Sequence, residues 1–193
     1  MSKKPTDPRF ERTESALRGA LMDQVAEKGF DAVKIDTLCK DAGVNRATFY
    51  LHHRDKFELL EVCLLGFFDD VEGAAAGTVT TDVESILPGL IRTAALNCAA
   101  RRDFILRILE DGKFPAFHAL FMKRMSYEVG LFMEQLKKEG RRLSPSSREH
   151  QVMFLSSAFF GAILQWIKSG SEEKLDGFCR DIAGYAMAVL AEK

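Results

Sequence analysis

Residues 35–60 read IDTLCKDAGVNRATFYLHHRDKFELL, and their spacing predicts two short helices joined by a tight turn and followed by a third helix. Ile35 and Leu38 fall at helical spacing before Gly43, the residue type that adopts a left-handed backbone without steric cost. Asn45 can then cap the next helix by accepting a backbone N–H. This is the pattern of a helix-turn-helix.

The second short helix is predicted to turn a chemically mixed face outward. Phe49 falls on its inward side. The outward positions are Arg46, Ala47, Thr48 and Tyr50. A guanidinium can contact guanine through two hydrogen bonds, a small residue permits close approach to a base edge, and hydroxyls suit phosphates. Such a face fits the major groove of double-stranded DNA.

A longer signature runs through the same stretch. Its residues are, in order, Gly43-Val44, Thr48-Phe49-Tyr50, His52 and Lys56, preceded by Arg12, Leu17, Ala20, Leu21, Val25 and Gly29-Phe30 in the first helix. In this order the segment resembles the DNA-binding domain of the TetR/AcrR family of transcriptional regulators. Combined with the outward face, the resemblance implies DNA contacts for Lys34, Asn45, Arg46, Ala47, Thr48, Tyr50, His52 and Lys56.

Three features depart from the resembled pattern. His53 stands where the family usually carries an apolar aromatic residue, and Asp36, which follows Lys34 near the start of the second helix, would repel phosphates. Residues 1–60 contain 11 Lys plus Arg against 10 Asp plus Glu, so any basic surface must be local. These features motivate an alternative, in which the protein keeps this fold but acts through a protein partner.

The composition indicates an all-α protein with a substantial core. The chain has 193 residues, 47% of them hydrophobic, and it lacks an alternating strand pattern or a linker rich in Pro, Gly and Ser. The net charge of −1 excludes a general polyanion-binding protein. With the resemblance, this predicts a three-helix DNA-binding domain over residues 1–54 and a larger helical ligand-binding and dimerisation domain over residues 55–193.

Cap and stop signals place the later helices. Asp55 is expected to open a helix that ends around Gly73, and a long helix is expected from Pro115 to Lys138. Further caps are predicted at Thr81 with Glu84, at Asp103, at Ser146 with Glu149 and at Ser171. The N-terminus is polar and no apolar run reaches about 18 residues, so we expect a cytoplasmic protein without a membrane segment.

Many Phe and Met side chains in the second part could line an effector pocket or simply fill the core. The resemblance to ligand-responsive regulators favours a cavity for a small apolar or aromatic molecule. Its candidate lining residues are Phe68, Asn97, Phe104, His118, Met122, Met125 and Phe160.

Small residues interrupt the bulky ones in the last two predicted helices, which permits close helix packing. This surface serves either the internal core or a dimer. The resemblance favours a homodimer, as does the need for two copies to read a palindromic operator, with recognition helices about 34–36 Å apart. The candidate interface residues are Ala158, Gly161, Ala162, Gln165, Phe178, Ile182, Tyr185 and Val189.

Catalytic, cofactor and metal chemistry are not expected. The sequence contains no GxSxG, Walker, GxGxxG or HExxH pattern. His52 and His53 would project about 100° apart on a helix, so they would not share a metal without an unusual turn. The four cysteines lie in apolar surroundings without a CxxC pair, which favours small buried hydrophobes over a redox sensor.

These patterns together predict a homodimeric transcriptional regulator, a repressor that leaves a palindromic operator when a small molecule binds. An enzyme is the third hypothesis, after the regulatory protein that works through a protein partner.

Overall fold

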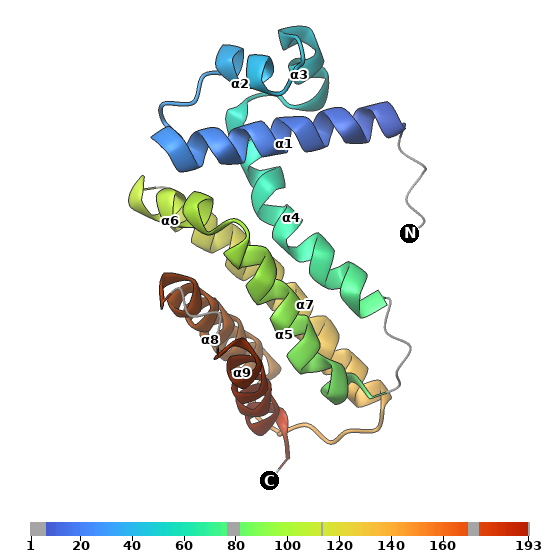
Figure 1. Cartoon of the computed structure of the whole chain (residues 1–193). Helices are drawn as coiled ribbons and strands as arrows, with labels where there is room; N and C mark the ends of the chain where they lie inside the picture. Colours follow the sequence, from blue (N-terminus) through green and yellow to red (C-terminus); the bar gives the residue numbers. More distant parts are fainter. Residues whose placement is uncertain (1–6, 77–81, 113, 170–173, 193) are drawn as a thin grey trace. The chain divides into compact units, whose positions relative to one another are not determined.

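The structure is a computed structural model that describes residues 7–76, 82–112, 114–169 and 174–192, and helices account for most of them (Figure 1). In chain order the helices are α1 (Pro8–Lys28), α2 (Ile35–Asp41), α3 (Arg46–His52), α4 (Lys56–Ala76), α5 (Val83–Ala99), α6 (Arg102–Glu110), α7 (Phe114–Lys138), α8 (Arg148–Ser169) and α9 (Leu175–Leu190). The all-α expectation is confirmed. Among the described residues, β pairing is confined to one isolated bridge, between Leu143 and Ala191.

The chain divides into two compact units. The first comprises Met1–Leu64 with Asp103–Phe117, and the second comprises Leu65–Arg102 with His118–Lys193. Helix α4 contributes residues to both units. The unit that holds the helix-turn-helix therefore extends past the predicted boundary at residue 54 and includes most of α6.

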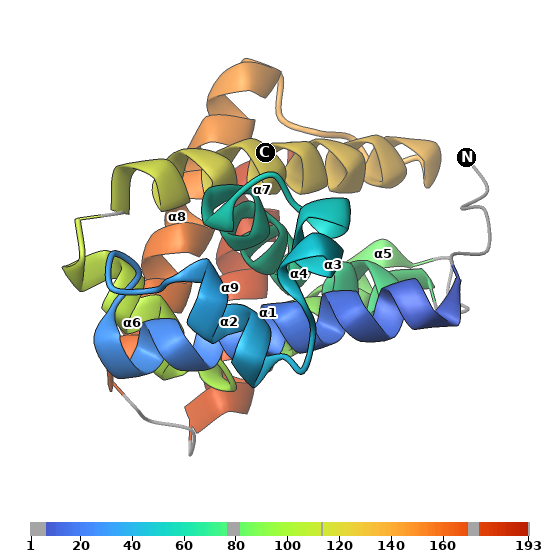
Figure 2. The same cartoon turned by 90° about the horizontal axis from the view of Figure 1, so that it is seen from above.

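In the first unit, α2 and α3 lie on the same side of α1 (Figure 1, Figure 2). The apolar stripe of α1 explains this arrangement, because Leu17, Leu21 and Val25 recur every four residues and are fully buried. The side-chain amide of the buried Gln24 in α1 donates to the Asp41 carboxylate at 2.5 Å. Its carbonyl accepts from the Thr37 hydroxyl at 3.3 Å, so polar bonds also fix α2 against α1.

The predicted turn between α2 and α3 is confirmed in its backbone detail. Gly43 has φ +67°, and the N–H of Val44 donates to the carbonyl of Cys39 at 2.9 Å, which closes the end of α2. The side chain of Asn45 accepts from the N–H of Thr48 at 2.8 Å and caps α3. Phe49, on the inward side of α3, is fully buried, so the opposite side of this helix faces solvent.

Asp111, the residue after α6, holds the turn that follows α1 through a hydrogen bond. The carboxylate of Asp111 accepts from the N–H of Phe30 at 2.7 Å, and the Arg107 guanidinium lies 3.4 Å from the other carboxylate oxygen. Gly29, which ends α1, has φ +81°. A Cβ atom built on Gly29 would overlap the Asp111 carboxylate. This position therefore requires glycine both for its backbone and for the space beside it.

The substitution Gly29→Ala is expected to lower the free energy of unfolding by about 2 kcal/mol. Ala must adopt a left-handed backbone there, and its methyl group displaces the carboxylate that accepts from Phe30. Urea denaturation measures the change. Gly19→Ala in α1 is the control, because a Cβ at Gly19 meets no atom within 4 Å and Ala favours the helix. Equal stability of the two variants would contradict the requirement for glycine at position 29.

In the second unit, α5, α8 and α9 pack against one another. Their shared core includes Leu87, Ala95, Leu155, Ala183 and Leu190, all buried. Helix α5 is capped by the Asp82 carboxylate, which accepts from the N–H of Glu84, and it runs through Pro88 as one element.

Three predicted boundaries in this unit need correction. Helix α4 continues to Ala76 rather than ending around Gly73. Helix α8 begins at Arg148, and the hydroxyl of Ser146 pairs with Ser144 instead of capping it. Helix α9 begins at Leu175. The caps predicted at Thr81 and Ser171 lie outside the described residues.

Among the described helices, α8 is the one long and apolar enough to match a membrane-crossing helix, with a mean hydropathy of 1.3 over 18 residues. The expectation of no membrane segment relied on the absence of an uninterrupted apolar run, and it stays a prediction, because length and composition alone do not place a helix in a membrane. Polar residues such as Ser157 and Gln165 interrupt the apolar sequence of α8. Only 28% of this 18-residue stretch of α8 is buried within the chain, so most of the stretch is accessible.

Candidate DNA-binding interface and effector cavity

The exposed face of α3 carries most of the predicted DNA-reading residues. Asn45, Arg46, Ala47 and Tyr50 are exposed there, and Thr48 is half-buried. Lys34, just before α2, is exposed as well. The helix-turn-helix thus brings six of the eight predicted residues together on an accessible surface. Their contact with DNA remains a prediction.

Asp36 lies beside the central guanidinium of this face. The Nη1 of Arg46 is 2.8 Å from the Asp36 carboxylate, and the Nη2 donates to the hydroxyl of Tyr50 at 3.2 Å. Both charged side chains are more than half exposed, so water screens their attraction and the pair contributes little to stability. The contacts with Asp36 and Tyr50 therefore hold the Arg46 guanidinium in position. The guanidinium can leave them at little energetic cost when it turns toward a base.

Lys56 is engaged inside the unit rather than presented to solvent. Its ammonium donates to the backbone carbonyls of Phe30, Asp31 and Val33 at 2.9, 3.2 and 2.9 Å. It also lies 4.7 Å from the centre of the Phe30 ring. The side chain fastens the connection between α1 and α2 to the first turn of α4 (Lys56–Ala76). The geometry gives Lys56 a structural role, independent of any phosphate contact.

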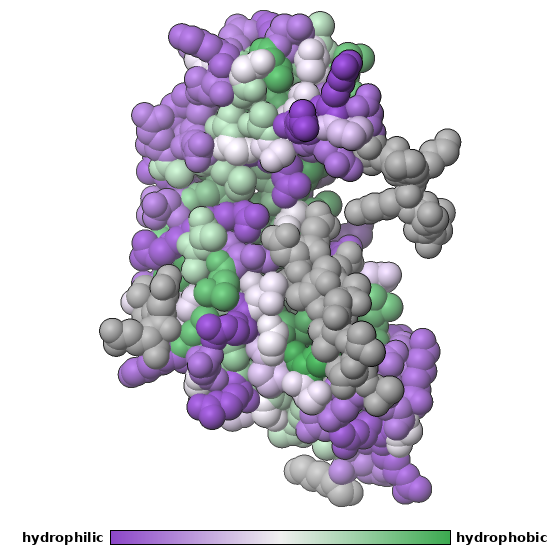
Figure 3. Space-filling model, turned by 45° about the vertical axis from the view of Figure 1, so that its right-hand side comes forward, coloured by the Kyte–Doolittle hydropathy of each residue, from purple (hydrophilic) through white to green (hydrophobic). Residues whose placement is uncertain are grey.

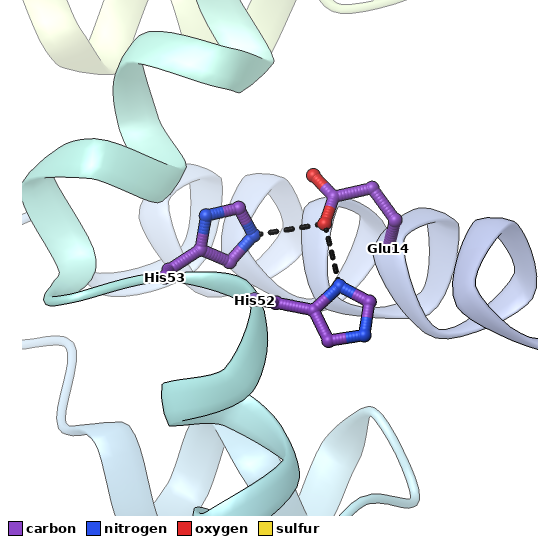
Figure 4. Close-up of side chains that lie close together, drawn as sticks. All are labelled: Glu14, His52 and His53. Carbon is purple, nitrogen blue, oxygen red and sulfur yellow. Dashed lines mark hydrogen bonds and ion pairs between the residues drawn. The ribbon is translucent and has the colours of Figure 1, made fainter. Parts of the chain in front are cut away.

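His52 is also turned inward, and it meets His53 at a shared carboxylate (Figure 4). The Oε2 of Glu14 is 3.0 Å from the Nδ1 of His52 and 2.9 Å from the Nε2 of His53. The ring of Phe10 stacks on His52 with centroids 3.8 Å apart. The expected separation of the two histidines was wrong, because α3 ends at His52 and His53 has an extended backbone, with φ −140° and ψ 141°.

Leu51 on α3 and Glu14 on α1 were not singled out from the sequence. Leu51 is 81% exposed, next to Tyr50 on the reading helix. The exposure of Leu51 could have been predicted, because helical spacing places Leu51 away from the inward side of α3 that Phe49 defines. Glu14 carried no local signal, because its partners lie 38 and 39 residues away.

The second unit contains a cavity of about 630 Å³. This volume lies within the range of small-molecule sites. Helices α4, α5, α7, α8 and α9 all contribute to its wall, and most lining side chains are apolar. The lining residues include Phe67, Phe68, Leu90, Ile91, Cys98, Met125, Glu128, Phe132, Phe159 and Ile163.

Two of the seven predicted pocket residues, Phe68 and Met125, line this cavity. The remaining five do not appear in its wall. His118 packs edge-on against Phe160, with ring centroids 4.9 Å apart, and Phe104 is buried in the first unit. Periodicity identified inward-facing residues, but neighbours on other helices decide which of them border empty space.

Two lining residues of the cavity, Glu128 and Cys98, have shifted pKa values. The carboxylate of Glu128 lies 2.7 Å from the Arg124 guanidinium, and burial raises the pKa of Glu128 although Arg124 opposes the shift. Burial also raises the pKa of the Cys98 thiol to about 12. Cys98 is therefore a protonated, apolar-like part of the wall at neutral pH, in keeping with its expected role as a small buried hydrophobe.

The predicted interface residues on α8 and α9 include several that are accessible. Ala158, Gly161, Gln165 and Tyr185 are exposed, whereas the other four predicted residues are half-buried. Met153 and Phe154, on the first turns of α8, are 59% and 57% exposed. These residues form an apolar surface of the second unit, and their place in a dimer remains a prediction.

In the view of Figure 3, hydrophobic residues come to the surface in groups between hydrophilic ones.

The fold and the exposed α3 face define the chain as a helix-turn-helix protein. Residues 18–63 match the family described as "Bacterial regulatory proteins, tetR family". The HTH-type transcriptional regulator YxbF of Bacillus subtilis (strain 168) is 37% identical over 62 residues, which are 32% of this chain and 16% of that relative. The chain thus matches this curated relative over about a sixth of the relative's length.

Solved structures resemble nearly the whole chain. A TetR transcription regulator from Haloarcula marismortui is 21% identical, with a TM-score of 0.66 over 94% of this chain and 100% of that one. RolR in complex with the ligand resorcinol is 18% identical, with a TM-score of 0.64 over 96% and 90% of the two chains. The helix-turn-helix segment thus matches the tetR family, and the fold of the whole chain is similar to that of solved TetR-family regulators.

Proposed function

We propose that the protein is a cytoplasmic, homodimeric transcriptional repressor that binds a palindromic operator and leaves it when a small apolar or aromatic molecule binds. The observation that carries this proposal is the capped α3 helix, which rests on buried Phe49 and presents Arg46 and Tyr50 to solvent. A helix held in this way can enter the major groove of DNA.

Arg46 is proposed to read a base, most favourably guanine, after exchanging its pair with Asp36 for the acceptors of the base edge. Ala47 permits close approach, and exposed Leu51 offers an apolar contact for a thymine methyl group. Lys34, Asn45, Thr48 and Tyr50 are proposed to position the phosphate backbone.

The substitution Arg46→Ala is expected to weaken operator binding by about 1–3 kcal/mol and to relax the sequence preference at one base pair of each half-site. Fluorescence anisotropy with DNA flanking the protein's own gene measures this at several salt concentrations. Asp36→Asn serves as the matched control, because it removes the ion pair and keeps the guanidinium, and it should bind at least as tightly as the wild type. Equal losses on specific and random DNA would contradict base reading by Arg46.

The apolar surface of α8 and α9 supports the homodimer. A second copy would cover the exposed residues Met153, Phe154 and Tyr185, and the small residues Ala158 and Gly161 would let two helices approach closely. Covering by a second copy also accounts for the apolar composition of α8, most of which is accessible in one chain.

The cavity in the second unit supports effector binding. Its volume and its Phe and Met lining suit an apolar or aromatic molecule. The lining carboxylate of Glu128 offers a hydrogen-bond acceptor to a polar substituent of such a molecule. RolR, a structural neighbour, binds resorcinol, an aromatic ring with hydroxyl groups. Native mass spectrometry of the purified protein tests this by detecting a bound small molecule and the mass of the dimer.

Release is proposed to work through α4, which runs from the helix-turn-helix unit to the cavity wall, where it contributes Phe67 and Phe68. A ligand that shifts α4 changes the separation of the two recognition helices. One half-site then no longer fits, and the gain from binding two half-sites together is lost.

An alternative function is regulation through a protein partner instead of operator release. The neutralisation of Arg46 by Asp36 favours it, together with the near balance of charge in residues 1–60. The anisotropy experiment separates the two functions, because specific DNA binding weakens steeply with salt. Absence of salt-sensitive specific binding would favour the partner hypothesis.

A further inference from the structure

Glu14, His52 and His53 bring three metal-ligating atoms together where α1 meets the end of α3 (Figure 4). The Glu14 Oε2, His52 Nδ1 and His53 Nε2 all lie within 4.8 Å of one another. Within residues 7–76, 82–112, 114–169 and 174–192, this is the one such group of three His, Cys, Asp or Glu side chains. The extended backbone of His53 creates it by turning the second ring back toward α1.

No Lys or Arg side chain pairs with the carboxylate of this cluster. The Glu14 side chain is only 20% exposed, and the imidazoles are 5% and 4% exposed. In the described part of the chain, no Lys or Arg nitrogen lies within 4.0 Å of the Glu14 carboxylate. An unbalanced carboxylate charge in such a largely buried place is costly, so the cluster needs a cation, either a proton on an imidazole or a metal ion. The three converging ligand atoms favour a divalent metal ion.

The distances are close to those of a tetrahedral metal site. Zinc binds imidazole nitrogen and carboxylate oxygen at about 2.0–2.2 Å, so its ligand atoms lie about 3.3–3.5 Å apart. The separations from Glu14 Oε2, at 3.0 and 2.9 Å, are within about 0.5 Å of that value. The two ring nitrogens, at most 4.8 Å apart, would have to approach each other by up to about 1.5 Å. Metal binding would therefore require a rotation of the two rings, including the His52 ring that stacks on Phe10.

We propose that Glu14, His52 and His53 bind one Zn²⁺-class transition-metal ion through these three atoms, with water as the fourth ligand. Two imidazoles and one carboxylate suit Zn²⁺, Fe²⁺, Co²⁺ and Ni²⁺, whereas Ca²⁺ and Mg²⁺ prefer oxygen ligands only. The ion would fasten α1 to the end of α3 and to the first residue of the α3–α4 connection. It would also keep the His52 ring from contacting phosphate, which separates this residue from the predicted DNA-binding set.

The test uses the full chain without DNA and titrates it with Zn²⁺ by isothermal calorimetry and with Co²⁺ by visible absorption. We expect one ion per chain, a spectrum of four-coordinate Co²⁺, and a rise of several degrees in Tm on adding Zn²⁺. Glu14→Gln and His53→Phe should each weaken binding by at least about 100-fold. His53→Phe introduces the aromatic residue that TetR/AcrR proteins usually carry there, so this variant should fold.

The matched control is His150→Gln, which removes an exposed histidine outside the cluster and should bind Zn²⁺ like the wild type. Absence of Zn²⁺ binding by the wild type at about 100 μM would overturn the proposal and leave a proton shared among the three side chains. Unchanged binding in His53→Phe, or equal loss in His150→Gln, would overturn it as well. Because DNA takes no part in the measurement, its outcome is independent of the proposed operator binding.

Discussion

The substitution Gly161→Glu is expected to convert the dimer into a folded monomer and to weaken operator binding by at least about 100-fold. Gly161 is exposed on α8, and a Cβ there meets no atom of its own chain within 4 Å. Glu also favours a helix more than Gly does, so the single chain should tolerate the change. In the proposed interface, two carboxylates would be buried against each other without partners.

Analytical ultracentrifugation gives the oligomeric state, and fluorescence anisotropy gives the affinity for operator DNA. The matched control is Gly89→Glu on α5, which adds the same side chain at another exposed glycine with no atom within 4 Å of its Cβ. This variant should remain dimeric and should bind DNA like the wild type. A dimeric Gly161→Glu with unchanged affinity would place the interface elsewhere than on α8.

The second large effect is expected from Lys56→Met, which should lower the free energy of unfolding of the helix-turn-helix unit by about 3 kcal/mol. Met retains the apolar stem over Phe30 but removes the ammonium that donates to three backbone carbonyls. Those carbonyls, two of them at part-buried bonds, would lose a charged donor. Urea denaturation measures the loss.

Lys34→Met is the control for Lys56→Met, because Lys34 is exposed and its side chain makes no hydrogen bond or ion pair with the described residues. It should change stability by less than about 0.5 kcal/mol. The salt dependence of DNA binding separates the two roles. Lys34→Met should reduce the slope of log affinity against log salt by about 1, and Lys56→Met should leave it unchanged. The opposite result would make Lys56 the phosphate contact.

Local sequence was sufficient to predict the helix-turn-helix. Gly43, Asn45 and Asp55 act on neighbours within four residues, so the left-handed turn and both side-chain caps follow from short-range spacing. The inward position of Phe49 follows from helical periodicity for the same reason. The later boundaries were less accurate, because capping boxes such as that predicted at Ser146 compete with other local hydrogen bonds.

The cavity of the second unit could be predicted only in outline. Composition and family resemblance indicated an apolar site in the second part, and Phe68 and Met125 do line the cavity. The aromatic contact between His118 and Phe160 depends on where α7 and α8 meet, which no local pattern specifies. The same is true of Cys98 and Glu128, whose places in the wall depend on helices far away in sequence.

The sequence by itself determined the all-helical fold, the helix-turn-helix and the exposed face of α3, because these depend on caps, turns and periodicity among near neighbours. Only the tertiary structure decided the intramolecular partners of Lys56 and His52, two residues for which the resemblance implies DNA contacts. Their partners, the Phe30 carbonyl and Glu14, lie 26 and 38 residues away. Hydrogen bonds between such distant residues form only after the helices pack, so spacing along the chain cannot reveal them.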